Sequence, residues 1–119
     1  MPIVWKECQG KKYLYVDYRG LKAEADMVKL LDQYSDILRS SSFKVSSISD
    51  FTGTAVGSSF LNRSKTLGKE LSGTKMQKNA LLGITGVKTI LLQGYLTFTG
   101  DKVSRPFASE AEALTWLSQ

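Results

Sequence analysis

The last forty residues constrain the fold most, because they alternate between strand-like and helix-like segments. Residues 78–84 form a short apolar run that ends at Thr85-Gly86, and an apolar helical pattern follows over residues 86–98. A brief strand is expected at 102–106 and a final helix at 109–118. A β-α-β-α order of this kind predicts parallel strands covered by helices.

The first two thirds of the chain extend this pattern. They predict two strands joined by a turn at residues 9–12, an amphipathic helix over 21–39, and a basic helix over 58–71 that Gly73 stops. The fold class is therefore α/β, with a mixed, mostly parallel five-stranded sheet and about four helices. We expect the first strand to pair antiparallel with the second, and the last four to be mutually parallel. The expected strands are residues 3–8, 12–18, 44–50, 78–84 and 102–106. The expected core is Tyr15, Val28, Leu31, Ile48, Leu81, Ile84, Leu114 and Trp116.

Length and composition predict one domain over residues 1–119 of this 119-residue chain. Cys8 is the single cysteine, which excludes an internal disulfide and favours a reducing compartment. The sequence shows neither a signal-peptide pattern nor an apolar run near the ~20 residues of a membrane span. We therefore expect a soluble cytoplasmic protein without integral membrane association.

Histidine is absent. The usual general base and the commonest metal ligand are therefore missing, and with a single cysteine no zinc site is expected. The glycine pattern before residue 87 matches neither a phosphate-binding P-loop nor a dinucleotide-binding loop, so we expect no cofactor. These features favour a protein that is not an enzyme, although chemistry by lysine, tyrosine or carboxylate stays open.

The net charge of +5 is unevenly distributed along the chain. Residues 61–105 hold eight Lys and Arg against two Asp and Glu. Such a basic region attracts anionic partners, or it is simply a solvated lysine-rich surface. No aromatic residues alternate with these charges as a base-stacking platform requires, so we expect no nucleic-acid binding.

Polar residues follow several of the expected parallel strands. Ligands of parallel α/β sheets bind beyond the carboxyl ends of the strands, so these residues predict a cleft for a small ligand. A lysine beside the first turn of the 86–98 helix would suit an anion. The alternative is that Asp50 and Thr52 only cap a turn. The candidate ligand-binding residues are Tyr18, Asp50, Thr52, Thr85, Gly86 and Lys88.

The helix at 86–98 carries more apolar residues than one sheet contact requires. They spread over roughly 240° of its circumference, whereas one covering face needs only a little over ~100°. Neighbouring helices, a second subunit or a lipid-like ligand could cover the surplus. We expect Val87, Ile90 and Phe98 to face the sheet, which leaves Leu92 and Leu96 as the candidate homodimer interface.

Three segments resemble the SpoIIAA-like family, which is allied to STAS domains and to the CRAL-TRIO lipid-carrier fold. They are the strand ending in Asp50, the turn in Ala80-Leu-Leu-Gly-Ile-Thr-Gly86, and the ending Pro106-Phe107-Ala-Ser-Glu-Ala-Glu-Ala-Leu-Thr-Trp116-Leu117. The resemblance spans about residues 10–118 and implies a small α/β binding or regulatory module. In STAS anti-sigma antagonists a phosphorylated serine follows an aspartate. Here Ser59 stands at the serine position and Ser58 replaces the aspartate.

Together these features predict a non-enzymatic cytoplasmic interaction or regulatory module, which forms a homodimer or binds another protein. The first alternative is a carrier or sensor of a small amphipathic, apolar or anionic ligand. The second is an enzyme of unknown reaction that uses Asp50 with Lys88 or Tyr18.

Overall fold

The chain begins with a tight β-hairpin. In the computed structural model, which describes residues 2–119, strands β1 (Ile3–Cys8) and β2 (Lys11–Asp17) are joined by Gln9 and Gly10. Both turn residues have positive φ, 52° and 78°, as a two-residue hairpin turn of the right twist requires. The second strand therefore begins one residue earlier than predicted.

Three strand–helix crossovers follow the hairpin, and α4 (Glu110–Leu117) ends the described chain. The elements between the hairpin and α4 are α1 (Glu24–Ser40), β3 (Val45–Asp50), α2 (Ser58–Leu71), β4 (Met76–Leu82), α3 (Val87–Thr99) and β5 (Ser104–Phe107). None of these helices is both long and apolar enough to cross a membrane, within residues 2–119.

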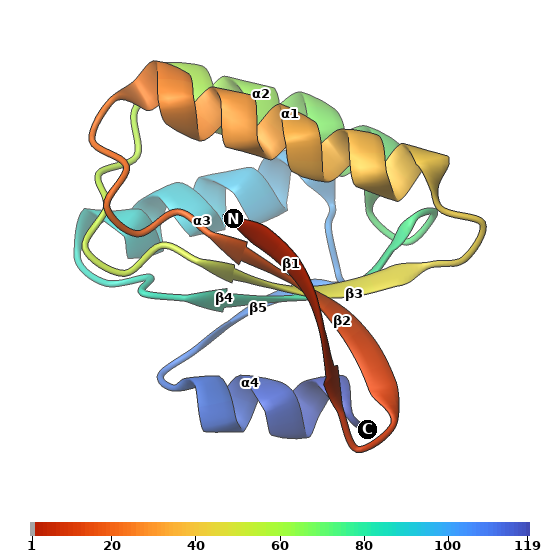
Figure 1. The fold of residues 1–119 in the computed structure, drawn as a ribbon. Coiled ribbons are helices and arrows are strands. Elements are labelled where there is room, and N and C mark those ends of the chain that lie inside the picture. The colour runs from red at the N-terminus through yellow and green to blue at the C-terminus, as the bar shows by residue number, and fades with distance from the viewer. Residues whose placement is uncertain (1) are drawn as a thin grey trace.

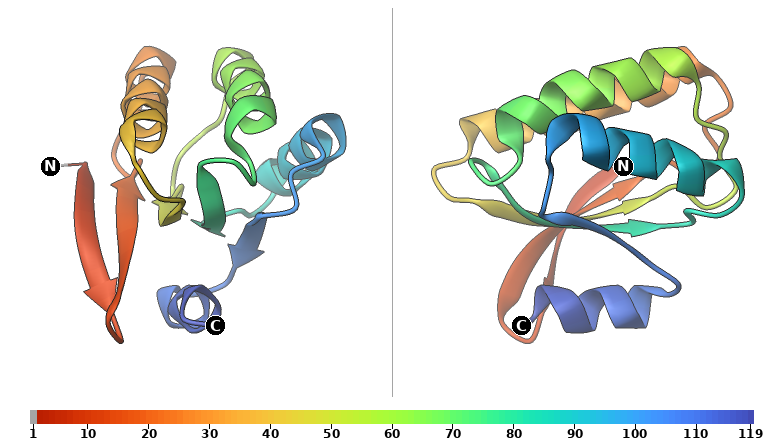
Figure 2. Two further views of the ribbon diagram at one scale, coloured as in Figure 1. Left: turned by 90° about the vertical axis from the view of Figure 1, so that its right-hand side faces the viewer. Right: turned by 180° about the vertical axis from the view of Figure 1, so that it is seen from behind.

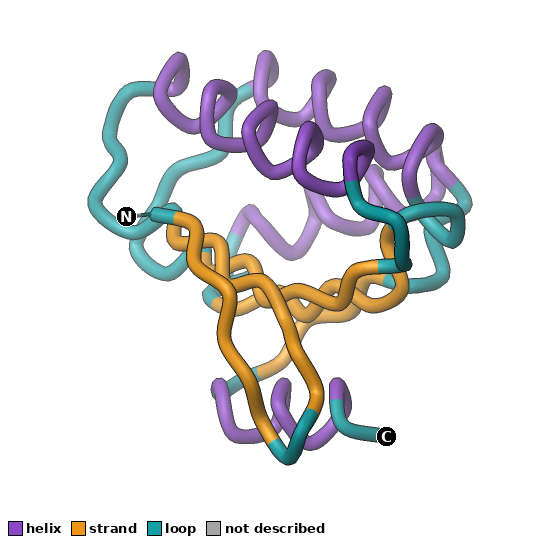
Figure 3. Tube along the Cα trace, turned by 45° about the vertical axis from the view of Figure 1, so that its right-hand side comes forward, coloured by secondary structure: helices purple, strands orange, loops and turns teal. Residues whose placement is uncertain are grey.

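The five strands lie in the sheet in chain order, β1-β2-β3-β4-β5. β1 is antiparallel to β2, and β2 to β5 are mutually parallel, as the sequence predicts. Helices α1, α2 and α3 lie side by side over one face of the sheet, and α4 alone covers the other (Figures 1 and 2). The hairpin extends past the sheet on the α4 side (Figure 3).

Each sheet face has its own hydrophobic core. The larger core lies under α1 to α3 and includes Leu14, Val16 and Val45 from the strands. The smaller core joins Tyr15, Ile48 and the α4 residue Ala113. Of the predicted core residues, Tyr15, Leu31, Ile48 and Leu81 are buried. Val28, Ile84, Leu114 and Trp116 are only partly buried and pack against the two cores.

Helix ends follow the sequence signals. The Ser109 hydroxyl accepts a hydrogen bond from the Glu112 backbone N–H at 3.2 Å, which caps α4 as predicted. Helix α2 ends at Leu71, and Gly73 follows with a φ of 77°. Helix α1 begins at Glu24, three residues later than the apolar pattern suggested.

The predicted orientation of α3 is wrong. Leu92 is buried under the helix layer and Leu96 packs against the same core. Val87, Ile90 and Phe98, which were expected to face the sheet, are 67%, 71% and 52% exposed. Surplus apolar surface is therefore present on α3, but on the side opposite to Leu92 and Leu96.

Candidate functional site

The carboxyl ends of β2 and β3 bring two aspartates together. Asp17 and Asp50 are register partners in the parallel pair, and Arg19 lies beyond them. The Arg19 guanidinium contacts Asp17 at 2.9 Å and Asp50 at 3.5 Å. We call Tyr15, Asp17, Arg19, Asp50 and Thr52 the strand-end cluster.

Asp50 is the buried centre of the strand-end cluster, and its acceptor sites are filled from within the chain. One carboxylate oxygen accepts from the Thr52 backbone N–H at 3.0 Å and from the Thr52 hydroxyl at 2.7 Å. The other accepts from the Tyr15 hydroxyl at 2.8 Å. This arrangement matches the alternative interpretation, in which Asp50 caps the turn after β3.

The lowered pKa of Asp50 agrees with a structural role for its carboxylate. Burial alone would raise the pKa of Asp50, but hydrogen bonds from Thr52 and Tyr15 and the charge of Arg19 outweigh burial and lower that pKa below its ordinary value. Asp50 is therefore ionised at neutral pH. Thr52, Tyr15 and the Arg19 guanidinium surround both oxygens of Asp50, so the carboxylate serves first as a structural acceptor.

Lys88, Thr85 and Gly86 do not complete a cleft with Asp50. The Lys88 ammonium is buried and donates to the Phe51 carbonyl at 2.9 Å. Burial lowers the pKa of Lys88, and the charge of Asp50 opposes that shift in part. Thr85 and Gly86 are exposed at the turn before α3. The six predicted ligand-binding residues therefore divide between the strand-end cluster, this turn and a cavity described below.

Ser59 is exposed in the first turn of α2, as its predicted role requires. The anion position at that helix end is already taken, because the Glu24 carboxylate of α1 accepts from the Ser59 backbone N–H at 2.9 Å. A Cβ on Gly57 would overlap the same carboxylate, so the glycine admits it. A phosphate on Ser59 would meet this negative charge, which disfavours the predicted phosphorylation site.

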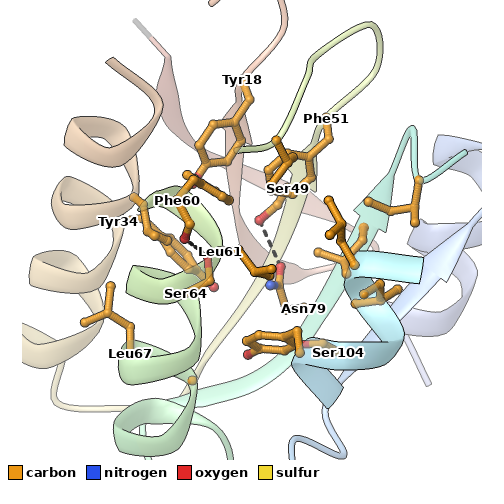
Figure 4. A pocket seen from close by; sticks show the side chains of 18 of the residues that line it. Tyr18, Tyr34, Ser49, Phe51, Phe60, Leu61, Ser64, Leu67, Asn79 and Ser104 are labelled. Atoms are coloured by element: carbon orange, nitrogen blue, oxygen red, sulfur yellow. Dashed lines mark hydrogen bonds between the residues drawn. The ribbon is translucent and has the colours of Figure 1, made fainter. Parts of the chain in front are cut away.

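A cavity of about 110 Å³ lies between the sheet and helices α1 to α3 (Figure 4). We call it the helix-face cavity. Phe60, Leu61 and Leu67 of α2 form one apolar wall, and Leu91 and Leu92 of α3 form the opposite one. Two predicted ligand-binding residues, Tyr18 and Lys88, line it as well. The Tyr18 ring stacks on Phe51 at 4.5 Å and meets the edge of Phe60, which closes one end.

Polar side chains of β3 and β4 form the floor of this apolar space. Asn79 Oδ1 accepts from the Ser47 and Ser49 hydroxyls at 3.1 and 3.0 Å, and Ser47 contacts the Tyr34 hydroxyl at 2.6 Å. Asn79 is only 8% exposed. Among residues 2–119 its amide nitrogen has no hydrogen-bond partner, although Asn79 lines the cavity. This nitrogen keeps some accessible surface, since Ser72 Oγ is the one fully buried side-chain polar atom without a partner in residues 2–119, and a ligand that brings an acceptor can therefore reach it.

Sequence reasoning missed Asn79, Ser47, Ser49 and Tyr34. A signal for them exists, since Val45-Ser-Ser-Ile-Ser-Asp50 is a central strand that alternates serine with residues on the opposite face. Strands buried on both faces are normally continuous apolar runs. Serines in such a strand indicate a polar network under the covering helices.

The comparisons with known proteins concern the fold. A crystal structure from Shewanella loihica PV-4, described as an uncharacterized protein from the DUF3478 family with a SpoIIAA-like fold, is similar to this chain with a TM-score of 0.70. The match covers 97% of this chain and 91% of that one, at 18% sequence identity. No family model and no curated protein matches the sequence. The likeness, together with a five-stranded mixed sheet and four helices in residues 2–119, shows that this chain has a SpoIIAA-like fold.

Proposed function

We propose that this chain is a non-enzymatic module that binds a small amphipathic ligand in the helix-face cavity, as a carrier or sensor. The observation that carries the proposal concerns Asn79 at the floor of an apolar cavity, because its amide nitrogen has no hydrogen-bond partner among residues 2–119. Small-molecule sites combine apolar walls with a few placed polar groups, and this cavity has that character.

Size narrows the ligand class. Engineered apolar cavities of about 150 Å³ hold benzene, so a cavity of about 110 Å³ that is partly open to solvent suits a ligand of roughly six or seven heavy atoms. A long acyl chain requires the helices to separate. The ligand we propose therefore has a compact apolar body and a hydrogen-bond acceptor, such as a carbonyl, that reaches Asn79.

The strand-end cluster supports a binding module rather than an enzyme. Its carboxylate, its hydroxyls and the nearby Lys88 ammonium are all used in internal hydrogen bonds. An interaction module that acts through a homodimer or another protein is the second candidate. The exposed apolar side of α3 favours it, and sedimentation of the protein at tens of micromolar tests the dimer.

Two probes of similar size test the cavity. Cyclohexanone carries an acceptor and toluene carries none, so both should shift amide resonances around the cavity, and cyclohexanone should bind more tightly. The Asn79 side-chain amide should shift with cyclohexanone alone. Native mass spectrometry of freshly purified protein provides an independent check for a retained ligand.

A variant with a filled cavity tests the binding site, and a substitution at an exposed position of the same helix is its matched control. Ser64 lines the cavity from α2, and its hydroxyl donates to the Phe60 carbonyl one turn back. Thr66 lies exposed on the same helix and makes the same kind of bond to Asn62. Ser64→Leu should abolish binding of both probes, whereas Thr66→Leu should not change it. If neither probe shifts any cavity resonance and no ligand is retained, the proposal fails.

A further inference from the structure

Helix α3 presents an uncharged apolar face to solvent. At 100° per residue, Val87, Ile90, Gly94 and Phe98 lie within an arc of about 80°. We call these four residues the α3 outer face. Three of them are exposed apolar side chains, and a Cβ at Gly94 would meet no atom within 4 Å. The helix has no acidic residue, and its single lysine, Lys88, is buried.

The position of α3 leaves this face open. The three helices over the sheet lie in a row, and α3 is at its outer end, with α2 on one side only (Figure 2). No element in residues 2–119 covers the α3 outer face. An apolar helix face of this kind marks an interaction surface.

The charged residues beside the α3 outer face indicate which kind of surface it binds. Lys65 and Lys69 of α2 flank the α3 outer face, with their ammonium groups 5.3 and 4.2 Å from the centre of the Phe98 ring. Among residues 2–119 neither lysine has a carboxylate within ion-pair distance. The nearby acidic residues are occupied, because Glu70 pairs with Arg39 and Asp101 is buried.

The opposite side of α2 shows the contrast. There Arg63 pairs with Asp32 of α1 at 2.8 Å, and Glu70 pairs with Arg39 at 2.7 Å. The α1–α2 contact is thus neutralised by ion pairs, whereas the α2–α3 side keeps two unpaired lysines beside an apolar face. Lysines that border an apolar helix face are typical of helices that lie in a membrane interface.

From this combination we propose that the α3 outer face docks on an anionic lipid bilayer. Helix α3 lies flat in the interface, Val87, Ile90 and Phe98 enter the acyl boundary, and Lys65 and Lys69 contact lipid phosphates. A second copy of the chain fits less well. A two-fold contact sets the same surface against itself, so these lysines would meet each other without an acidic partner.

Vesicle flotation tests the docking, and it does not depend on whether the helix-face cavity binds a ligand. The protein should float with vesicles of phosphatidylcholine and phosphatidylglycerol at low salt, and much less with phosphatidylcholine alone or at 0.5 M salt. Lys65→Glu with Lys69→Glu should lower the partition coefficient at least about tenfold, and so should Ile90→Glu.

Two matched controls separate docking from general charge and stickiness. Lys22 and Lys29 are exposed lysines outside this region, so Lys22→Glu with Lys29→Glu makes the same change in net charge. Phe43 is 55% exposed and lies far from α3 in the chain, so Phe43→Glu makes the same kind of apolar-to-acidic change as Ile90→Glu. Both controls should keep most of the vesicle binding, and circular dichroism should show that every variant is folded.

Three results would overturn the proposal. The first is absence of flotation with anionic vesicles. The second is an equal loss of binding in the Lys22 and Lys29 variant, which would indicate unspecific attraction. The third is a dimer in analytical ultracentrifugation that Ile90→Glu converts into a monomer, because the α3 outer face would then be a contact between subunits.

Discussion

The strand-end cluster and the helix-face cavity differ in how their buried polar groups are satisfied. In the strand-end cluster, Asp50 has a partner for each carboxylate oxygen within the chain. In the cavity, Asn79 uses its oxygen internally, while its nitrogen has no partner within the part of the chain that the structure describes, residues 2–119. A polar group whose partners are all internal stabilises the fold, whereas one that lacks a partner offers a bond to a ligand. The polar residues at the strand ends are therefore the weaker binding candidates here.

The largest expected effect on stability is at Gly83, which lies close to the backbone of Thr52 in the strand-end cluster. Gly83 has a φ of 78°, and a Cβ there would overlap the backbone nitrogen of Thr52. Gly83→Ala should cost about 3–4 kcal/mol of unfolding free energy, since a positive-φ penalty adds to a backbone clash. Urea unfolding of the wild type and of Gly83→Ala measures this loss of unfolding free energy.

Gly100 provides the control for Gly83. It has a φ of 70° in the left-handed region, but a Cβ there would meet nothing within 4 Å. Gly100→Ala should therefore show the conformational penalty alone, about 1–2 kcal/mol. Equal losses in the two variants would mean that the approach of Gly83 to Thr52 is not tight.

A smaller effect is expected when Asp50 loses its charge. Asp50→Asn should cost about 2–3 kcal/mol at pH 7, because hydrogen bonds to a buried carboxylate become bonds to a neutral amide. Asp17→Asn should cost less than about 1 kcal/mol, because its partner Arg19 is exposed.

The pH dependence follows from the lowered pKa of Asp50. A carboxylate with a lowered folded pKa adds stability above its unfolded pKa of about 3.9, and that stability is lost as the pH falls through the folded value. The difference between the wild type and Asp50→Asn should therefore be constant near neutrality and shrink below about pH 4. A difference that persists unchanged at pH 2 would contradict an ionised Asp50.

Local sequence signals predicted the order of elements well. Strand β1 and helix α2 match their predicted bounds, because a glycine-containing turn after Cys8 and a glycine after the helix mark these ends in the sequence. The capping role of Ser109 and the strand-end position of Asp50 were also predictable. These features depend on residues close together in the sequence.

The orientation of α3 was not predictable in this way, because this helix is apolar around most of its circumference. The contacts of Tyr95 determine the orientation of α3. The Tyr95 hydroxyl donates to Asp101 at 2.7 Å, and its ring occupies the space that a side chain at Gly68 of α2 would fill. This contact turns Leu92 and Leu96 inward. The helix-face cavity was equally hidden, since it depends on how side chains from three helices and two strands fill space together.

Asn79→Leu has the smallest expected effect on stability, and it tests directly whether the Asn79 nitrogen binds the acceptor of a ligand. Asn79→Leu leaves the Ser49 hydroxyl without its acceptor, while Ser47 can donate to the Tyr34 hydroxyl instead, which should cost about 1 kcal/mol in urea unfolding after the added apolar contact offsets part of the loss. The effect should be clearly smaller than that of Asp50→Asn, because the Asn79 nitrogen has no internal bond to lose. Asn62 is an exposed asparagine on α2, so Asn62→Leu is the control and should not change probe binding. In Asn79→Leu, cyclohexanone should lose its advantage over toluene while toluene still binds. If cyclohexanone keeps its preference, another group in the cavity provides the donor, and Tyr18 is the next residue to test, because within residues 2–119 its hydroxyl also has no hydrogen-bond partner.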